Sequence, residues 1–196
     1  TLIGRLAPRE MSGEFFGLFA LSGRARPSEL TEGLGSDWAV ASGYHKAYGC
    51  CQYAHSAIEA TLDALAALSG PAAALDSSRV RRVTVEAHKL GMSLANYAPE
   101  TTLAAKFSLP HCVASTIVSG NAGHRTFGAP SLADSRVAAL RSRVELIPYL
   151  PDDQPWPHDR PARVTIEIDD GSRITCDCQS AKGQPDRPLS EQELFA

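Results

Sequence analysis

Residues 163–178, which read RVTIEIDDGSRITCDC, carry the strongest β-strand pattern of the chain. Apolar residues from Val164 to Ile168 alternate with polar ones, as expected of a strand with one buried and one solvated face. The Asp170-Gly171 pair that separates the two alternating runs favours a two-residue type I′ turn. The segment therefore predicts a β-hairpin whose apolar face packs on helices.

The segments around this hairpin change between helical and strand patterns. A capping serine and a proline in the first turn predict a helix from Ser108 to Gly120. Apolar spacing and β-branched residues predict the other elements: helices over 51–68 and 132–140, strands over 79–87 and 144–148, a helical stretch within the first forty residues and a short helix near residue 189. Proline-rich residues 148–161 are expected to form a surface loop. This order predicts an α+β fold, with a mixed or antiparallel sheet packed against helices.

The composition argues against several classes of protein. A formal net charge of -3 over 196 residues is unlike the clustered basic charge that nucleic-acid binding requires. The longest apolar runs are far shorter than the ~20 residues of a membrane-spanning helix, so no membrane partner is expected. Five cysteines in an irregular layout are unlike a secreted disulfide scaffold and predict a cytoplasmic protein. Hydrolase, P-loop and dinucleotide-binding motifs are absent from the sequence.

Two lysines each stand just before a predicted helix. Lys46 precedes the helix that begins at Cys51, and Lys106 precedes the helix capped by Ser108, which carries His111 in its first turn. The unpaired amides of a helix start carry partial positive charge, and a lysine beside them strengthens the attraction for an anion. Two lysines, each beside a helix start, are suited to binding the two carboxylates of one ligand. From spacing alone, the plainer interpretation is favoured, in which both lysines are ordinary solvated residues.

The histidine and cysteines near these lysines also have two interpretations each. His55 lies four residues before Glu59, and this spacing favours a surface or core histidine oriented by that carboxylate. Cys50 and Cys51 at a helix start are suited to a lowered thiol pKa and to nucleophilic attack, but buried packing is the favoured role. The spacing of histidines and cysteines does not match a metal site, so no metal is expected.

The run from Gly43 to Ala60, GYHKAYGCCQYAHSAIEA, resembles the signature that opens the lid domain of MmgE/PrpD proteins. Residues 106–114, KFSLPHCVA, then the hairpin and a terminal Pro188-Leu189-Ser190 agree with this family in order. The family includes 2-methylcitrate dehydratase and cis-aconitate decarboxylase, which act on small di- or tricarboxylates without a required metal or nucleotide cofactor. The resemblance therefore implies a hydro-lyase that removes water from a small hydroxy-polycarboxylate and needs no cofactor.

Family members combine a large all-helical domain with a smaller α+β lid, hold the active site between them and usually form homodimers. The resemblance implies that residues 1–35 belong to or border the helical domain, residues 36–180 form the lid, and residues 181–196 are a linker and the start of a C-terminal helix. Since Thr1 opens without an initiator methionine, we expect a portion of a longer protein. A homodimer through the larger domain is expected, as is weak or absent catalysis by this portion alone.

The resemblance also implies roles for single residues. Lys46 corresponds to the lysine of the family's lid that faces the substrate, and His55 corresponds to the histidine of the family signature. Both are therefore predicted to be catalytic. Cys51, Lys106 and His111 are predicted, together with Lys46, to bind the substrate. Cys51 stands where decarboxylases of the family have an active-site histidine, which counts against decarboxylation. Two alternatives stay open: a decarboxylase of a cis-aconitate-like acid, and a non-catalytic binding or assembly module in which the lysines are solvated.

Overall fold

The computed structural model describes residues 32–38, 40, 43–69, 75–149 and 160–194. The chain forms a small unit, Thr1–Gly43, and a larger unit, Tyr44–Ala196, that holds the helices and strands named below. Described residues of the small unit make a turn in which the amides of Ser36 and Asp37 donate to the carbonyl of Gly33. The helix predicted within the first forty residues and most of the loop predicted over 148–161 lie outside the described residues.

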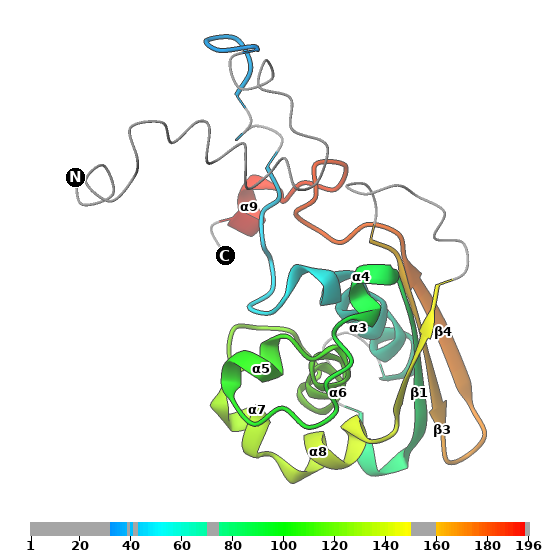
Figure 1. Cartoon of the computed structure of the whole chain (residues 1–196). Coiled ribbons are helices and arrows are strands. Elements are labelled where there is room, and N and C mark those ends of the chain that lie inside the picture. The colour runs from blue at the N-terminus through cyan, green and yellow to red at the C-terminus, as the bar shows by residue number, and fades with distance from the viewer. Residues whose placement is uncertain (1–31, 39, 41–42, 70–74, 150–159, 195–196) are drawn as a thin grey trace. The chain divides into compact units, whose positions relative to one another are not determined.

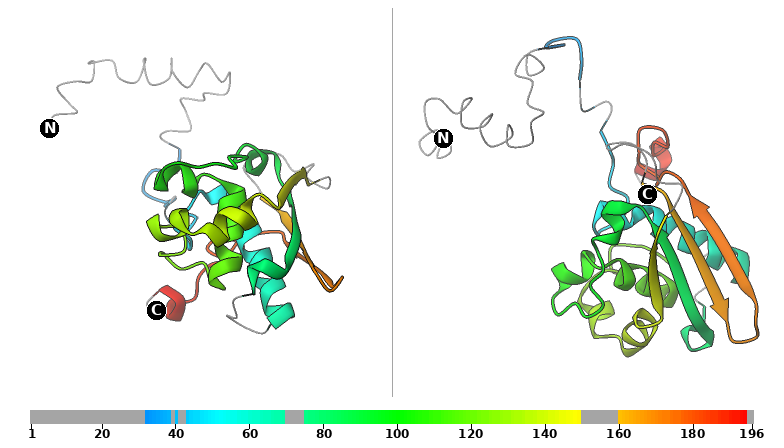
Figure 2. Two further views of the ribbon diagram at one scale, coloured as in Figure 1. Left: turned by 90° about the horizontal axis from the view of Figure 1, so that it is seen from below. Right: turned by 45° about the vertical axis from the view of Figure 1, so that its right-hand side comes forward.

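A four-stranded mixed sheet forms one layer of the larger unit (Figure 1). Its strands are β1 (Val80–Ala87), β2 (Val144–Pro148), β3 (Ala162–Ile168) and β4 (Arg173–Cys178), in the spatial order β2-β1-β3-β4. Strand β1 is parallel to β2 and antiparallel to β3, and β3 is antiparallel to β4. The helices gather on one side of this sheet (Figure 2). The predicted α+β fold with a mixed sheet is confirmed.

Two longer helices dominate the second layer. They are α3 (His55–Ser69), preceded by the 3-10 turn η3 (Gln52–Ala54), and α6 (Leu109–Ser119). The short helices are η4 (Ser77–Arg79), α4 (Lys89–Met92), α5 (Thr102–Lys106), α7 (Ala129–Ala133), α8 (Ser135–Arg141) and α9 (Glu191–Leu194). Helix α3 packs on β3 and β4, and α6 packs on α3 and α8. Among the described helices, none is long and apolar enough to cross a bilayer.

The two faces of the sheet differ in polarity. Val83 and Ile166 are fully buried in the core that the sheet shares with the helices. At alternate positions, Arg163 of β3 pairs with Glu86 of β1 at 3.4 Å and with Asp177 of β4 at 2.7 Å. Such solvent-accessible pairs contribute at most about 1 kcal/mol each, so burial of the valine and isoleucine face is the main stabilising contribution. The outer face therefore stays polar, as the hairpin pattern predicts.

Helix α6 begins and ends as predicted. The Ser108 hydroxyl accepts the amide hydrogen of His111 at 3.1 Å, and a proline occupies the first turn. Gly120 ends the helix in the left-handed conformation with φ of 66°. The strands predicted over 79–87 and 144–148 are confirmed within one residue at their ends.

Two sequence predictions were wrong in detail. The helix predicted over 132–140 is two helices, α7 and α8, because the Asp134 side chain accepts the amide hydrogen of Arg136 at 2.8 Å and caps a new helix. The hairpin turn has three residues, since the Ile168 amide donates to the carbonyl of Ser172 at 2.9 Å. Gly171 takes the last position of this turn with φ of 87°, a conformation that a glycine adopts at low cost.

Candidate active site

A backbone hydrogen bond joins the two lysine-bearing segments. The amide of Cys51, at the start of η3, donates to the carbonyl of Lys106, at the end of α5, over 2.8 Å. The thiol of Cys112, near the start of α6, lies 4.0 Å from the same carbonyl oxygen. The start of η3 and α3 and the start of α6 therefore lie side by side, as two neighbouring anion sites require.

The two lysine side chains differ in exposure. Lys46 is exposed in the extended segment before η3, and Lys106 is half-buried at the end of α5. Neither side chain forms an ion pair with another residue in the described part of the chain. A role for these lysines in substrate binding remains a prediction that the described contacts permit.

His55 is a core residue held by two tyrosines. The side chain is 1% exposed, its Nδ1 shares a short hydrogen bond with the phenol of Tyr44, and the ring of Tyr48 meets it edge-on at 5.0 Å between centroids. Its Nε2 is buried without a hydrogen-bond partner among the described residues. The sequence interpretation that Glu59 orients His55 is wrong, because Tyr44 occupies that position.

Glu59 instead connects α3 to the segment that follows β4. Its carboxylate accepts hydrogen bonds from the Tyr48 phenol at 3.3 Å, the Arg187 guanidinium at 2.9 Å and the backbone amide of Lys182. Burial is the main reason that the pKa of Tyr48 is raised, and the negative charge of Glu59 raises it further. Glu59 therefore ties α3 to Tyr48 and to the segment after β4.

The pKa values of Cys50 and Cys112 are shifted in opposite directions. Interaction with Cys112 lowers the pKa of Cys50 to about 6, although burial opposes the shift, and His55 and the charge of Lys46 lower it further. Interaction with Cys50, together with burial, raises the pKa of Cys112 well above its ordinary value. Among the residues that the structure describes, no group of three or more His, Cys, Asp or Glu side chains is placed to hold a metal ion.

His111 makes its contacts with a different set of residues. It is completely buried, and its ring nitrogens lie 3.2 Å from the hydroxyl of Ser131 and 3.1 Å from the guanidinium of Arg141. Burial and the charge of Arg141 lower the pKa of His111 to about 4. His111 is thus neutral near pH 7, and its described partners belong to the α7 and α8 region rather than to the Cys50 and His55 group.

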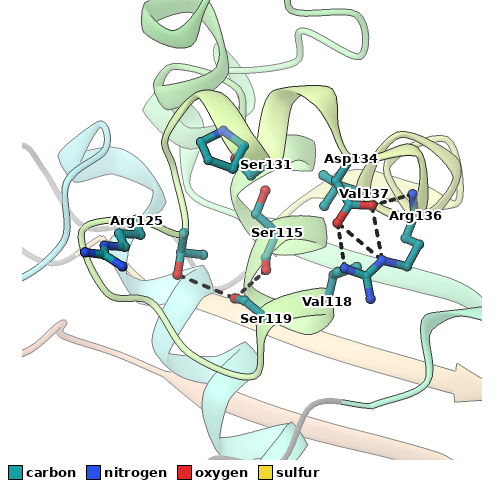
Figure 3. A pocket seen from close by; sticks show the side chains of 10 residues that line it. Ser115, Val118, Ser119, Arg125, Ser131, Asp134, Arg136 and Val137 are labelled. Atoms are coloured by element: carbon teal, nitrogen blue, oxygen red, sulfur yellow. Dashed lines mark hydrogen bonds and ion pairs between the residues drawn. The ribbon is translucent and has the colours of Figure 1, made fainter.

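A separate hollow of about 180 Å³ lies between α6, α7 and α8 (Figure 3). Ser115, Ser119 and Ser131 contribute hydroxyl groups to its lining, and the Ser115 hydroxyl is buried without a described partner. Arg136 at its edge is held by Asp134 at 2.7 Å. A space of this size admits water, which would satisfy the Ser115 hydroxyl. None of the predicted site residues lines this hollow.

A comparison with protein-family models matches residues 48–196 to the MmgE/PrpD C-terminal domain. The chain belongs to the MmgE/PrpD family. The resemblance inferred from the sequence is therefore confirmed, and the four-stranded sheet with its helices is an MmgE/PrpD C-terminal domain. Cys51, His55, Lys106 and His111 lie within the matched range, whereas Lys46 stands just before it. A search of the curated proteins gave no match.

Several residues around this part of the MmgE/PrpD domain were missed by the sequence reasoning. Tyr44 and Tyr48, two residues before and two after Lys46, both contact His55. Arg160 stacks on Tyr53 with its guanidinium 5.5 Å from the ring centroid, and its charge also acts on Tyr44. It brings a further cation to the start of η3. No local pattern around Arg160 indicates this position.

Proposed function

We propose that this chain is the substrate-carboxylate-binding lid of a hydro-lyase that removes water from a small hydroxy-polycarboxylate. The observation that carries the proposal is the hydrogen bond from the Cys51 amide to the Lys106 carbonyl. This bond brings the start of η3 and α3 next to the start of α6. Each start brings its own lysine, so two carboxylates of one substrate can be bound together. Membership of the MmgE/PrpD family supports the reaction class, because this family is generally dehydratase-like.

The proposed chemistry needs positive charge held in place. Removing a proton next to a carboxylate builds a second negative charge, which fixed donors and cations stabilise. Lys46, Lys106 and the backbone amides at the two helix starts are proposed to supply this stabilisation, with Arg160 as a further cation. His55 stays in the proposal as an acid-base residue, since its Nε2 has no described hydrogen-bond partner. The general base is proposed to lie in the family's helical domain.

Calorimetric titration of citrate into the full chain tests carboxylate binding. Lys46→Met and Lys106→Met are each expected to weaken binding about tenfold, which corresponds to the loss of one charge-assisted contact. Arg81→Met is the matched control, because Arg81 is exposed on β1 and its loss changes the net charge equally. Equal affinities for all four proteins would leave no anion site and would favour the binding or assembly module.

Turnover is tested on the chain alone and on a preparation that includes the family's helical domain. Water loss from a hydroxy-tricarboxylate creates a double bond that ultraviolet absorbance follows, and released carbon dioxide is measured in parallel. The chain alone is expected to be weak or inactive, and the larger preparation is expected to lose water. Robust turnover by the 196 residues alone contradicts the placement of the base, and carbon dioxide release favours the decarboxylase alternative.

A further inference from the structure

Arg160 lies where the end of β1 and the start of β3 meet η3. It stands just before β3, whose first residue, Ala162, pairs with Ala87 at the end of β1. The guanidinium of Arg160 lies over the ring of Tyr53 in η3, 5.5 Å from the ring centroid. A cation in this position is attracted to the face of the ring, so the contact holds the guanidinium at η3.

Tyr53 is itself fixed by the residue that follows β1. Its carbonyl oxygen lies 3.1 Å from Nε2 of His88, and the two rings meet edge-on at 5.8 Å between centroids. Helix α4, which His88 caps, also packs against η3. Because Tyr53 packs against the hydrophobic core as well, the ring that supports Arg160 has a defined position.

The positive charge of Arg160 has no counter-ion among the described residues. No ion pair or hydrogen bond joins its guanidinium to another residue in that part of the chain, and its Nε is buried without a hydrogen-bond partner. Buried N–H groups are nearly always paired, and a half-buried charge without a counter-ion is unfavourable. An anion bound to this guanidinium would supply the missing partner.

Arg163 shows how the same contacts look when an arginine is paired. Its guanidinium lies 5.6 Å from the centroid of the Tyr149 ring, and its exposure is intermediate, like that of Arg160. It also pairs with Asp177 at 2.7 Å and with Glu86 at 3.4 Å. Arg160 stacks on a tyrosine in the same way but lacks both carboxylates. This difference indicates a carboxylate that the described residues do not supply.

The turn η3 connects Arg160 to the site proposed above. Cys51, the residue before η3, donates its amide hydrogen to the carbonyl of Lys106 at 2.8 Å, and Tyr53 lies two residues later. Like Arg160, Lys46 and Lys106 form no ion pair within the described ranges. The segments that meet at η3 therefore carry three cations, none with a described counter-ion.

We propose that Arg160 is a specificity-determining residue whose guanidinium binds one further carboxylate of the substrate, beyond the two assigned to the lysines. This inference rests on the proposed function, because it concerns the same ligand and the same site. A guanidinium donates two parallel hydrogen bonds to the two oxygens of a carboxylate while its flat face stays on Tyr53. A ligand with a methyl group in place of this carboxylate leaves the guanidinium unpaired and is bound more weakly.

Calorimetric titration of the full chain with citrate and with citramalate tests the specificity. Citramalate has a methyl group where citrate has one of its carboxymethyl arms, so it offers one carboxylate fewer. The wild type is expected to bind citrate about tenfold more tightly than citramalate. Arg160→Met should weaken citrate binding about tenfold and leave citramalate binding nearly unchanged, whereas Lys46→Met should weaken both. Arg160→Lys should keep only part of the preference, because an ammonium group cannot form the paired hydrogen bonds.

Arg163→Met is the matched control, because Arg163 also stacks on a tyrosine but has its partners within the chain. It should lower the melting temperature and leave citrate affinity unchanged. Arg160→Met should keep or raise the melting temperature of the chain without ligand, since it removes an unpaired charge and keeps an apolar side chain on Tyr53. The opposite effects of the two substitutions distinguish a ligand contact from a structural contact.

Two results would overturn the role of Arg160. Unchanged citrate affinity in Arg160→Met means that Arg160 binds no carboxylate, and equal losses for citrate and citramalate mean that it does not determine the preference. Should Arg160→Met not fold, Arg160→Lys provides the same comparison. If the wild type binds neither ligand, the proposed function fails as well. If the lysine variants lose affinity and the Arg160 variants do not, the inference alone fails.

Discussion

At the scale of single residues, neighbours decide how buried titratable groups behave. Cys50 and His111 are both nearly inaccessible, and burial opposes the charged form of each. Interactions with Cys112, His55 and Lys46 outweigh burial at Cys50 and lower its pKa. At His111 the guanidinium of Arg141 adds to the effect of burial and favours the neutral imidazole. Neighbouring groups thus oppose the effect of burial on the pKa at Cys50 and add to it at His111.

Replacing His111 with glutamine is expected to reduce the acid sensitivity of the fold. Burial, and then Arg141, lowers the pKa of His111 from 6.5 to about 4. Between these two pKa values, His111 is protonated in the unfolded chain and neutral in the folded chain. The free energy of unfolding therefore falls as the pH drops through this window, by roughly 1 kcal/mol per pH unit at most. His111→Gln should lose this slope in urea unfolding curves recorded across the window.

His124→Gln serves as the control for this prediction, because His124 is exposed on a loop. It should keep the slope of the wild-type chain. If all three proteins lose stability equally on acidification, a group other than His111 is responsible.

At the scale of elements, capping side chains decide where the helices around the site begin. The Ser108 hydroxyl accepts the amide hydrogen of His111 and donates to the carbonyl of Asn96, so it both starts α6 and ties it to the loop before α5. Ser108 is completely buried, and water cannot replace these bonds. The position of Cys112 against the carbonyl of Lys106 therefore depends in part on this cap.

Ser108→Ala is expected to lower the free energy of unfolding by about 1–2 kcal/mol, because it removes a cap and leaves buried polar backbone groups without partners. Denaturant unfolding of the wild type and the variant measures the change. Thr101→Ala is the matched comparison, since Thr101 is exposed and caps the short helix α5. Its effect should be the smaller of the two, and a larger effect at Thr101 would show that α5 rather than α6 controls stability.

At the scale of the whole described unit, the segment after β4 holds the segment that carries Lys46. The amide of His45 donates to the carbonyl of Gly183 at 2.8 Å, and Arg187 reaches the carboxylate of Glu59 on α3. Lys46 follows His45 directly, so its position depends on residues near the far end of the chain.

Gly183→Ala is expected to destabilise the unit and to weaken citrate binding together. Gly183 has φ of 90°, and an added Cβ would overlap the carbonyl oxygen of His45, so the segment before η3 must move. Gly171→Ala is the matched control, because Gly171 has φ of 87° with open space around it. Both variants lose about 1 kcal/mol from the positive φ, and Gly183→Ala should lose at least about 2 kcal/mol more.

Thermal unfolding and citrate titration of both variants measure these effects. Equal melting temperatures for Gly183→Ala and Gly171→Ala would show that the contact with His45 does not constrain the fold. If Gly183→Ala is destabilised but binds citrate with unchanged affinity, Lys46 does not contribute to the citrate site.

The fold could be predicted further than the site. Helix α6 with both its ends, the strands and the hairpin follow from patterns a few residues long, and each was predicted within a residue or two. The split at Asp134 was missed because an aspartate within a helical pattern is compatible with both a continuous helix and a new cap. Around the candidate site, the sequence predicted roles for Lys46 and Cys51, which remain predictions, and did not indicate the tyrosine that holds His55.

The sequence by itself determined the family, the mixed α+β architecture and the presence of two lysines at helix starts, because local spacing and local motifs encode all three. Only the tertiary structure decided that the Cys51 amide bonds to the carbonyl of Lys106, that Tyr44 rather than Glu59 holds His55, and that the segment near Gly183 supports Lys46. The physical reason is that each of these contacts joins residues distant in the chain, and they form only when the helices and the final loop pack together in the folded unit.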